Sequence, residues 1–202
     1  LGQHVGTAFA QIVAEELDLD WSKVNIDYPE MDSVQVQKTG QQITGGSMSV
    51  LTSFTQLAQS AAVARQFLVE AGAEILGSAP ADCITQSGSV IDPIFEQKIS
   101  YSEILSQTTI SHTIQPEELA AASLKKREDY KIIGQSLPAL DIEEKVNGKA
   151  KYSIDAFVPN MVYGKMSLAP TRLGSTISSV NDIAAREEIP GYIRTLSLSA
   201  SG

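Results

Sequence analysis

Two glycine-containing segments stand directly before stretches that the sequence predicts to be helical. Gly2-Gln3 precedes a predicted helix over 5–17, and Thr44-Gly45-Gly46-Ser47 precedes a long predicted helix over about 48–76. The first turn of a helix offers unpaired backbone N–H groups and the positive end of the helix dipole. Glycines there let a phosphate approach those groups, and Thr or Ser hydroxyls add donors. The sequence therefore predicts two anion-binding helix starts, which one ligand with a pyrophosphate could engage together.

The longer glycine segment does not match the common phosphate-binding motifs. No Lys follows Gly46, so the segment is not a P-loop, and its spacing is not G-x-G-x-x-G. The alternative to phosphate binding is that Ser47 is merely an N-cap after a Gly-Gly turn. The segment by itself leaves both interpretations open.

Side chains that suit a transition metal or nucleophilic catalysis are few. His4, Cys83 and His112 are isolated in the sequence, without the close pairing of ligands typical of zinc sites. We therefore predict no metal site, and interpret the histidines as surface or loop residues and the thiol as half-buried. A Cys83–His112 nucleophilic pair has no local signature to support it.

Adjacent acidic residues occur at Glu15-Glu16 and Glu143-Glu144. Neighbours on a helix point about 100° apart, so neither pair is placed to act on one substrate. We expect both pairs, and the acid-rich stretch from Glu15 to Asp32, to lie on a solvated surface.

The elements that must position these residues follow from hydrophobic periodicity. Apolar side chains at three- and four-residue steps predict the helices over 5–17 and 48–76, the second ended by Gly77. Shorter helices are predicted at Tyr101–Gln107, capped by Ser100 or Ser102, at Glu117–Leu124 with Pro116 in the first turn, and at Asp182–Glu188. Alternating or short apolar runs predict strands at 23–28, 82–86, 89–91, 96–99, 150–156, 161–168, 177–180 and 192–198, with Ser87-Gly88 as a hairpin turn.

Composition narrows the function classes. With 43% hydrophobic and 19% charged residues, the 202-residue chain has globular composition, and its net charge of -9 disfavours nucleic-acid binding. No apolar run approaches the roughly 20 residues of a membrane span, and one cysteine permits no internal disulfide. The chain begins at Leu1 without a signal segment and ends directly after a strand-like run, so we expect a piece of a longer protein. The charged stretch 125–145 predicts a domain boundary.

Several motifs, taken in order, resemble the molybdenum-binding subunit of the xanthine oxidase family. Leu1-Gly2-Gln3 and the alanine-rich helix after it are similar to the family's E-M-G-Q-G segment, and residues 44–50 are similar to its T-G-G-S-x-S. Ala61–Arg65 then resembles the branch of isoquinoline 1-oxidoreductase beta subunits and related bacterial aldehyde dehydrogenases. Residues 130–134 and 140–155 resemble the entry to the family's hammerhead-like region. The resemblance covers nearly the whole chain.

This resemblance implies an α+β fold, with a partial molybdopterin-binding domain over 1–135 that contains one long helix, and a truncated hammerhead-like α/β domain over 136–202. The implied cofactor is a molybdopterin dinucleotide with molybdenum, in bacteria usually the cytosine form. The implied reaction is oxidative hydroxylation of an aldehyde or N-heterocycle, with oxygen from water and electrons leaving through a separate 2Fe–2S subunit. The residues that match the pterin-facing motif are Gly2 and Gln3, and those that match the segment near the phosphates are Thr44, Gly45, Gly46, Ser47 and Ser49.

The chain departs from the family pattern in ways that bear on function. His4 stands where the family has a second glycine, Leu1 replaces Met, and Ala139 replaces an Arg. The family's catalytic glutamate, in a G-x-G-E segment, does not occur, so we predict no catalytic residue here and no turnover or cofactor retention by this chain alone. The alternatives are a non-catalytic binding or assembly module of the same ancestry and an unrelated α+β nucleotide-binding domain. The sequence leaves the compartment open, although related large subunits often carry a twin-arginine export signal, which implies the periplasm.

Overall fold

A computed structural model describes residues 2–28, 44–171 and 174–198. The chain divides into two compact units, Leu1–Lys151 and Tyr152–Gly202. The sequence departure at Leu1 lies outside the described residues. The predicted domains, 1–135 and 136–202, stay a prediction.

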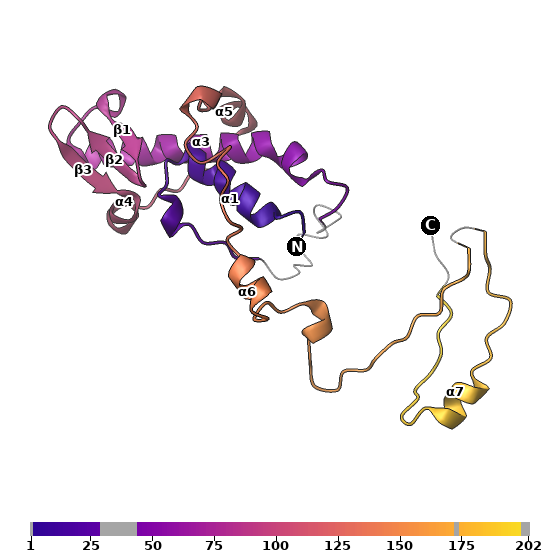
Figure 1. Ribbon diagram of the computed structural model, residues 1–202. Coiled ribbons are helices and arrows are strands. Elements are labelled where there is room, and N and C mark those ends of the chain that lie inside the picture. Colours follow the sequence, from indigo (N-terminus) through magenta and orange to yellow (C-terminus); the bar gives the residue numbers. More distant parts are fainter. Residues whose placement is uncertain (1, 29–43, 172–173, 199–202) are drawn as a thin grey trace. The chain divides into compact units, whose positions relative to one another are not determined.

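Two long helices organise the first unit. The helix α1 spans Val5–Glu16 and α3 spans Ser49–Leu76, which confirms both predicted helices (Figure 1). Gly77 ends α3 in the left-handed conformation, with φ of 70°. The two helices pack against each other. Every residue of α1 is buried or half-buried, so no face of this helix is fully exposed.

A small antiparallel sheet packs at the far end of α3. Its strands are β1 (Ile84–Gln86), β2 (Ser89–Asp92) and β3 (Gln97–Ser100), in the order β1-β2-β3. Ser87 and Gly88 join the first two strands with positive φ at both positions, as a type I′ hairpin turn requires. The predicted strands of this region and their turn are therefore confirmed.

The core of the first unit lies between this sheet, α3 and α4 (Tyr101–Gln107). Of the two caps that the sequence left open, Ser100 and Ser102, the structure has Ser100, which forms a reciprocal capping box with Glu103. Two hydrogen bonds join the end of α1 to this core, from the Tyr101 hydroxyl to the carbonyl of Leu17 at 2.9 Å and from the Gly88 amide to that of Asp18 at 2.8 Å. The buried apolar cluster is made of Leu68, Val90, Ile99, Tyr101 and Ile104.

The remaining described elements are short. The helices α5 (Pro116–Ala121) and α7 (Ile183–Glu188) agree with predicted helices, although α5 ends three residues early. The helix α6 (Ile142–Val146) was not predicted. Single 3₁₀ turns occur at Trp21–Lys23, Pro80–Asp82, Arg127–Asp129 and Ser153–Asp155.

Several predicted strands are wrong. Within the described part of the chain, residues 24–28 form no strand, and there are no strands at 150–156, 161–168, 177–180 or 192–198. The alternating side chains there remain in solvent, with Tyr163 83% and Leu168 77% exposed. Alternation shows that a segment suits a half-buried sheet, but a strand forms only where a second strand satisfies its backbone groups. The coarse α+β class is confirmed by the helices and the antiparallel sheet of the first unit.

One glycine of α3 marks the closest approach between helix and sheet. A Cβ added at Gly72 would lie 2.8 Å from Cγ2 of Val90 and 3.0 Å from Cδ1 of Ile104. Glycine in a helix interior is unfavourable by about 1 kcal/mol relative to alanine. The close packing therefore explains a residue that helix propensity disfavours.

We predict that Gly72→Ala destabilises the chain by about 2 kcal/mol, because the added methyl group forces α3 away from the core. Urea unfolding followed by circular dichroism measures the change. Gly164→Ala is the matched control, since a Cβ there meets no atom within 4 Å. A Gly72→Ala chain as stable as the original would show that helix propensity outweighs the packing.

Candidate functional site

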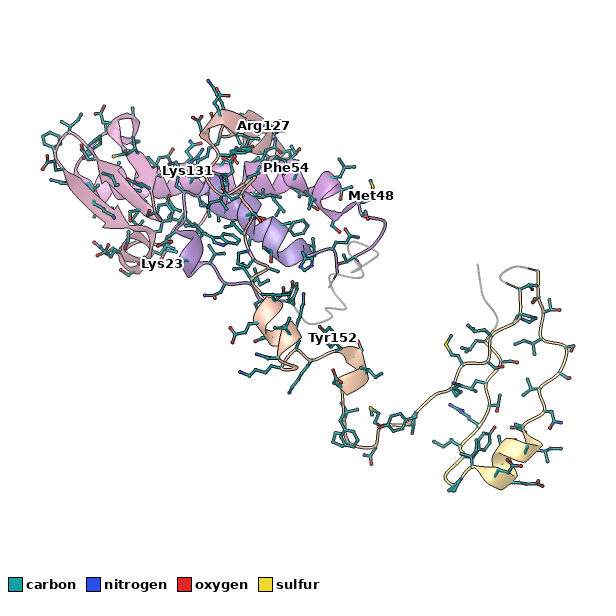
Figure 2. All side chains as sticks on the ribbon, viewed as in Figure 1. Lys23, Met48, Phe54, Arg127, Lys131 and Tyr152 are labelled. Carbon is teal, nitrogen blue, oxygen red and sulfur yellow. The ribbon has the colours of Figure 1, made fainter. Side chains whose placement is uncertain are left out.

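The two predicted anion-binding segments lie at helix starts at the same end of the first unit, where α1 and α3 begin (Figure 1). Gln3 and His4, with φ of 59° and 50°, lead into α1. Gly46 and Ser47, with φ of 61° and 55°, lead to Met48, which precedes α3 (Figure 2). Each helix is thus entered through two successive left-handed residues.

Neither of these helices is capped by the side chain of its own N-cap residue. The N-cap positions are His4 for α1 and Met48 for α3, and neither makes a side-chain capping hydrogen bond. The interpretation of Ser47 as the N-cap of the long helix is therefore wrong, because Ser47 lies one position before the cap in a left-handed conformation. Ser49 is the first residue of α3.

The charge distribution at the two starts suits an anion. Neither α1 nor α3 has an acidic residue in its first turn, although the chain carries a net charge of -9. Of the other described α-helices, α4, α5 and α6 carry acidic residues there, whereas α7 carries none. Acidic groups near a helix start would compete with a bound anion for the same N–H groups.

The glycines leave room beside both starts. A Cβ added at Gly2 or Gly45 would meet no atom within 4 Å. Gly2, Gln3, Gly45, Gly46 and Ser47 are exposed, whereas Thr44 and Ser49 are half-buried. The predicted residues therefore fit a phosphate-bearing ligand in charge and in space.

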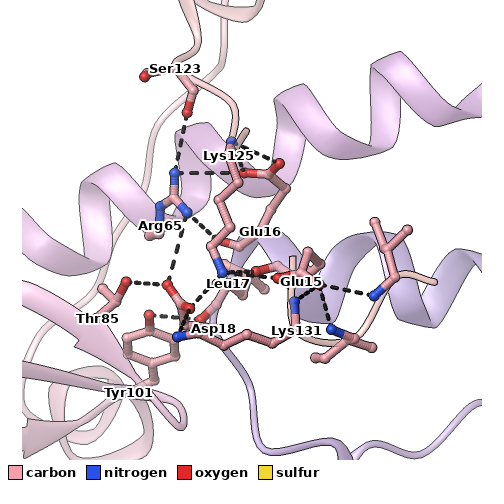
Figure 3. Close-up of polar contacts among 12 residues, drawn as sticks. Glu15, Glu16, Leu17, Asp18, Arg65, Thr85, Tyr101, Ser123, Lys125 and Lys131 are labelled. Carbon is pink, nitrogen blue, oxygen red and sulfur yellow. Dashed lines mark hydrogen bonds and ion pairs between the residues drawn. The ribbon is translucent and has the colours of Figure 1, made fainter. Parts of the chain in front are cut away.

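A second set of polar side chains, which the sequence did not predict, lies at the opposite end of α1 (Figure 3). We call Glu15, Glu16 and Asp18, with their partners Arg65 and Lys125, the carboxylate cluster. The predicted solvated surface for Glu15 and Glu16 is wrong, because these residues are only 1% and 2% exposed. The error arose because acidic side chains on a helix usually face solvent, whereas Lys125 and residues 131–133 cover Glu15 and Glu16 here.

Glu15 is bound mainly by backbone amides. Its Oε2 accepts hydrogen bonds from the amides of Lys131, Ile132 and Ile133, at 2.9, 2.6 and 3.0 Å. Its Oε1 lies 3.2 Å from Nζ of Lys125. This one carboxylate therefore ties a segment 116 residues further along the chain to α1.

The other members of the carboxylate cluster add further contacts between α1 and the rest of the first unit. Both carboxylate oxygens of Glu16 accept from the amide of Lys125, at 3.2 and 3.3 Å. Asp18 accepts from Nζ of Lys125 and from the Thr85 hydroxyl, both at 2.5 Å. Arg65 of α3 donates to the carbonyl of Glu16 at 2.7 Å. The cluster thereby joins α1, α3 and β1 to one loop.

The pKa values of the two adjacent glutamates shift in opposite directions. Burial raises the pKa of Glu15, but the amide hydrogen bonds from residues 131–133 and the contact with Lys125 outweigh it and lower the pKa overall. Burial also raises the pKa of Glu16, and the Lys125 amide and Arg65 do not offset it. The surroundings of Glu15 therefore favour its ionised form, whereas those of Glu16 disfavour it.

The chain from Lys125 to Asp141, which we call the strap, runs back along α1 from its end to its start. Besides the bonds to Glu15, Gln11 donates to the carbonyl of Ile132 at 3.3 Å. The amide of Leu140 donates to the hydroxyl of Thr7 at 3.0 Å. Thr7, Gln11 and Glu15 are spaced four residues apart, so they form one polar face of α1. All three side chains of that face bind the strap.

The strap ends against the first turn of α1. Oδ2 of Asp141 accepts from the Tyr28 hydroxyl at 2.8 Å and pairs with Nζ of Lys145 at 2.6 Å. The Tyr28 hydroxyl lies so close to α1 that a Cβ added at Gly6 would be 2.5 Å from it. Tyr28 therefore covers the helix where the predicted ligand site begins.

Two hollows of the described structure lie beside the carboxylate cluster. The larger one, about 690 Å³, is lined in part by Arg65, Cys83, Thr85 and Tyr130, and a smaller one of about 120 Å³ lies over Glu15. None of the predicted site residues lines either hollow. Burial raises the pKa of the Cys83 thiol, so its reactive thiolate is disfavoured.

The remaining candidate residue from the sequence, His112, contacts other side chains of the fold. Nε2 of His112 lies 2.8 Å from Oε1 of Glu118, and its ring packs on Phe67 with centroids 4.7 Å apart. Within the described part of the chain, no three or more His, Cys, Asp and Glu side chains gather to hold a metal ion. No helix of that part has the length and apolar character to cross a membrane.

Comparison with known proteins shows that the chain matches one protein family and is similar to three relatives. Residues 1–158 match the family described as the molybdopterin cofactor-binding domain. The chain is 43% identical, over 97% of its length, to the membrane-bound aldehyde dehydrogenase (pyrroloquinoline-quinone) of Gluconacetobacter polyoxogenes. It is 32% identical over 98% of its length to the beta subunit of isoquinoline 1-oxidoreductase from Brevundimonas diminuta, and 32% identical over 84% to a nicotinate dehydrogenase subunit from Pseudomonas putida.

These relatives are much longer than the chain. The matches cover 25% of the aldehyde dehydrogenase, 29% of the isoquinoline oxidoreductase subunit and 14% of the nicotinate dehydrogenase subunit. The 202 residues thus correspond to roughly a quarter of the first two.

We predict that Glu15→Gln destabilises the chain by about 3 kcal/mol at pH 7, because a neutral side chain cannot serve three amides and Lys125 equally well. The pKa of Glu15 is lowered on folding, so its stabilisation is present above about 4.5 and is lost as the pH falls below that value. The difference between the two chains should therefore shrink in acid. Denaturant unfolding from pH 7 to pH 3 tests this, with exposed Glu74→Gln as the control. A constant difference across that range would contradict the assignment.

We also predict that His4→Gly stabilises the chain by about 1 kcal/mol, because glycine adopts a φ of 50° without the steric penalty of a side chain. The thermal unfolding midpoint measures the effect. His112→Gly changes the same residue type outside the left-handed positions, and should lower the midpoint. A lower midpoint for His4→Gly would mean that the imidazole makes a stabilising contact.

Proposed function

The chain belongs to the molybdopterin cofactor-binding domain family of molybdenum hydroxylase large subunits, and on that premise we propose that its two helix starts hold the phosphate-bearing cofactor. The observation that carries the proposal is that α1 and α3 begin at one end of the first unit (Figure 1), uncapped and without first-turn acids. An acidic chain can bind phosphate there through backbone N–H groups. An accidental resemblance, and with it an unrelated nucleotide-binding domain, is overturned by the family match.

Within this proposal the two segments have different roles. Gly2-Gln3 lies against the pterin, and Thr44, Gly45, Gly46, Ser47 and Ser49 lie near the phosphates of a molybdopterin cytosine dinucleotide. The left-handed residues 3–4 and 46–47 support cofactor binding at both segments, because each segment places an open glycine beside a helix start. When bound, the cofactor supplies a molybdenum centre for oxidative chemistry. The chain's own residues bind and orient it.

We propose that the whole protein oxidises an aldehyde or an N-heterocycle with oxygen from water, and passes electrons to a 2Fe–2S subunit. Two relatives are named as individual subunits of oxidoreductases, which supports a partner subunit. No residue of this chain is assigned to catalysis. Residues 1–135 would then form part of the cofactor-binding domain, and 136–202 a hammerhead-like domain.

Two alternatives are separable by experiment. The relative at 43% identity is named for pyrroloquinoline quinone, which is also an anionic cofactor. Extraction of the full-length protein should yield a fluorescent pterin with molybdenum in equal amount, and a quinone in its place would overturn the proposal. A non-catalytic assembly module is favoured if the complete gene lacks a G-x-G-E segment and the protein retains no cofactor.

We predict that Ser47→Asp empties the cofactor site of the full-length enzyme, because it sets a negative charge against phosphate at the start of α3. Aspartate tolerates the left-handed conformation of this position, so folding should be preserved. Molybdenum content by mass spectrometry measures the loss. Ser102→Asp places an acid in the first turn of α4 as the control and should leave the content unchanged. Full molybdenum content in Ser47→Asp would contradict the placement of phosphate at this turn.

A further inference from the structure

We infer that Thr7 is a positioning residue, which holds the cofactor-facing start of α1 in place through the strap. This inference rests on the proposed function, because it assigns a role toward the same ligand. Thr7 is the third residue of α1 and is 6% exposed. Its side chain therefore faces protein and not the ligand, and any effect on the ligand must pass through the helix.

The strap is attached more firmly at one end of α1 than at the other. At the far end, Glu15 accepts from three successive amides and Lys125 adds two ion pairs. Near the start, one hydrogen bond joins the strap to the helix, from the Leu140 amide to Thr7. One residue later, the strap ends at Asp141. The contact at Thr7 is thus the last direct attachment before the proposed site.

The first turn of α1 depends on contacts from other segments, because its N-cap residue His4 makes no side-chain capping hydrogen bond. No side chain caps His4, and the backbone before Val5 takes two left-handed residues in succession. Left-handed conformations of residues other than glycine are unfavourable and persist only when neighbouring structure holds them. Thr7, with Tyr28 over Gly6, supplies such contacts in the first turn. Loss of the Thr7 bond should loosen the turn while the carboxylate cluster keeps the strap bound.

The test compares three variants of the full-length enzyme. Thr7→Val keeps the shape of the side chain but removes the hydroxyl, and leaves the Leu140 amide without its acceptor. Thr7→Ser restores a hydroxyl. Gly72→Ala lowers stability at the sheet, far along α3 from the site, and so controls for a general loss of stability. The measured quantity is the rate at which pterin fluorescence appears in solution, per folded molecule, well below the unfolding temperature.

We expect pterin release from Thr7→Val to be about fivefold faster than from the wild type, the effect of one net hydrogen bond. Release from Thr7→Ser and Gly72→Ala should stay near the wild-type rate. Equal rates for wild type and Thr7→Val, or equal acceleration in Gly72→Ala, would overturn the positioning role. Absence of pterin from the wild-type enzyme would instead overturn the proposed function, so the two failures are distinguishable.

Discussion

The buried carboxylate of Glu15 is the interaction on which the first unit depends. An unpaired buried charge would be strongly destabilising, and the chain avoids this by aiming three backbone amides and Lys125 at one side chain. The same contacts satisfy three amides of a loop that belongs to no helix or strand. A single residue of α1 thus anchors the strap, and the strap in turn covers the polar face of the helix.

The two ends of α1 have opposite electrostatic surroundings. Glu15 and Glu16 occupy its last turn, where the negative end of the dipole disfavours acids, and Arg65 and Lys125 offset that arrangement. The first turn of α1 itself carries no acidic residue, and the side chain of His4 makes no capping hydrogen bond. Concentrating the acids and their cations at one end leaves the positive end of the helix available to an anion. The family match over residues 1–158 agrees with a cofactor role for this part of the chain.

In the second unit, segments with the alternating sequence pattern of strands do not form strands. Its alternating segments have the periodicity of strands, and their apolar side chains, such as Tyr163, Leu168 and Ile193, are more than half exposed. Its main polar contacts are local, since Arg186 and Tyr192 both bind Asp182 at the start of α7. Local contacts of this kind hold a helical turn but cannot replace the backbone pairing of a sheet.

The sequence by itself determined the long helices, the hairpin and the capped α4, because periodicity, Ser87-Gly88 and Ser100 are local signals. Its glycine motifs also indicated the two helix starts. Only the tertiary structure decided that Glu15 is buried and that Thr7 and Gln11 bind the strap, because their partners lie more than 100 residues away along the chain. It also decided that the alternating segments stay unpaired, since a strand depends on a neighbour that its own residues do not encode.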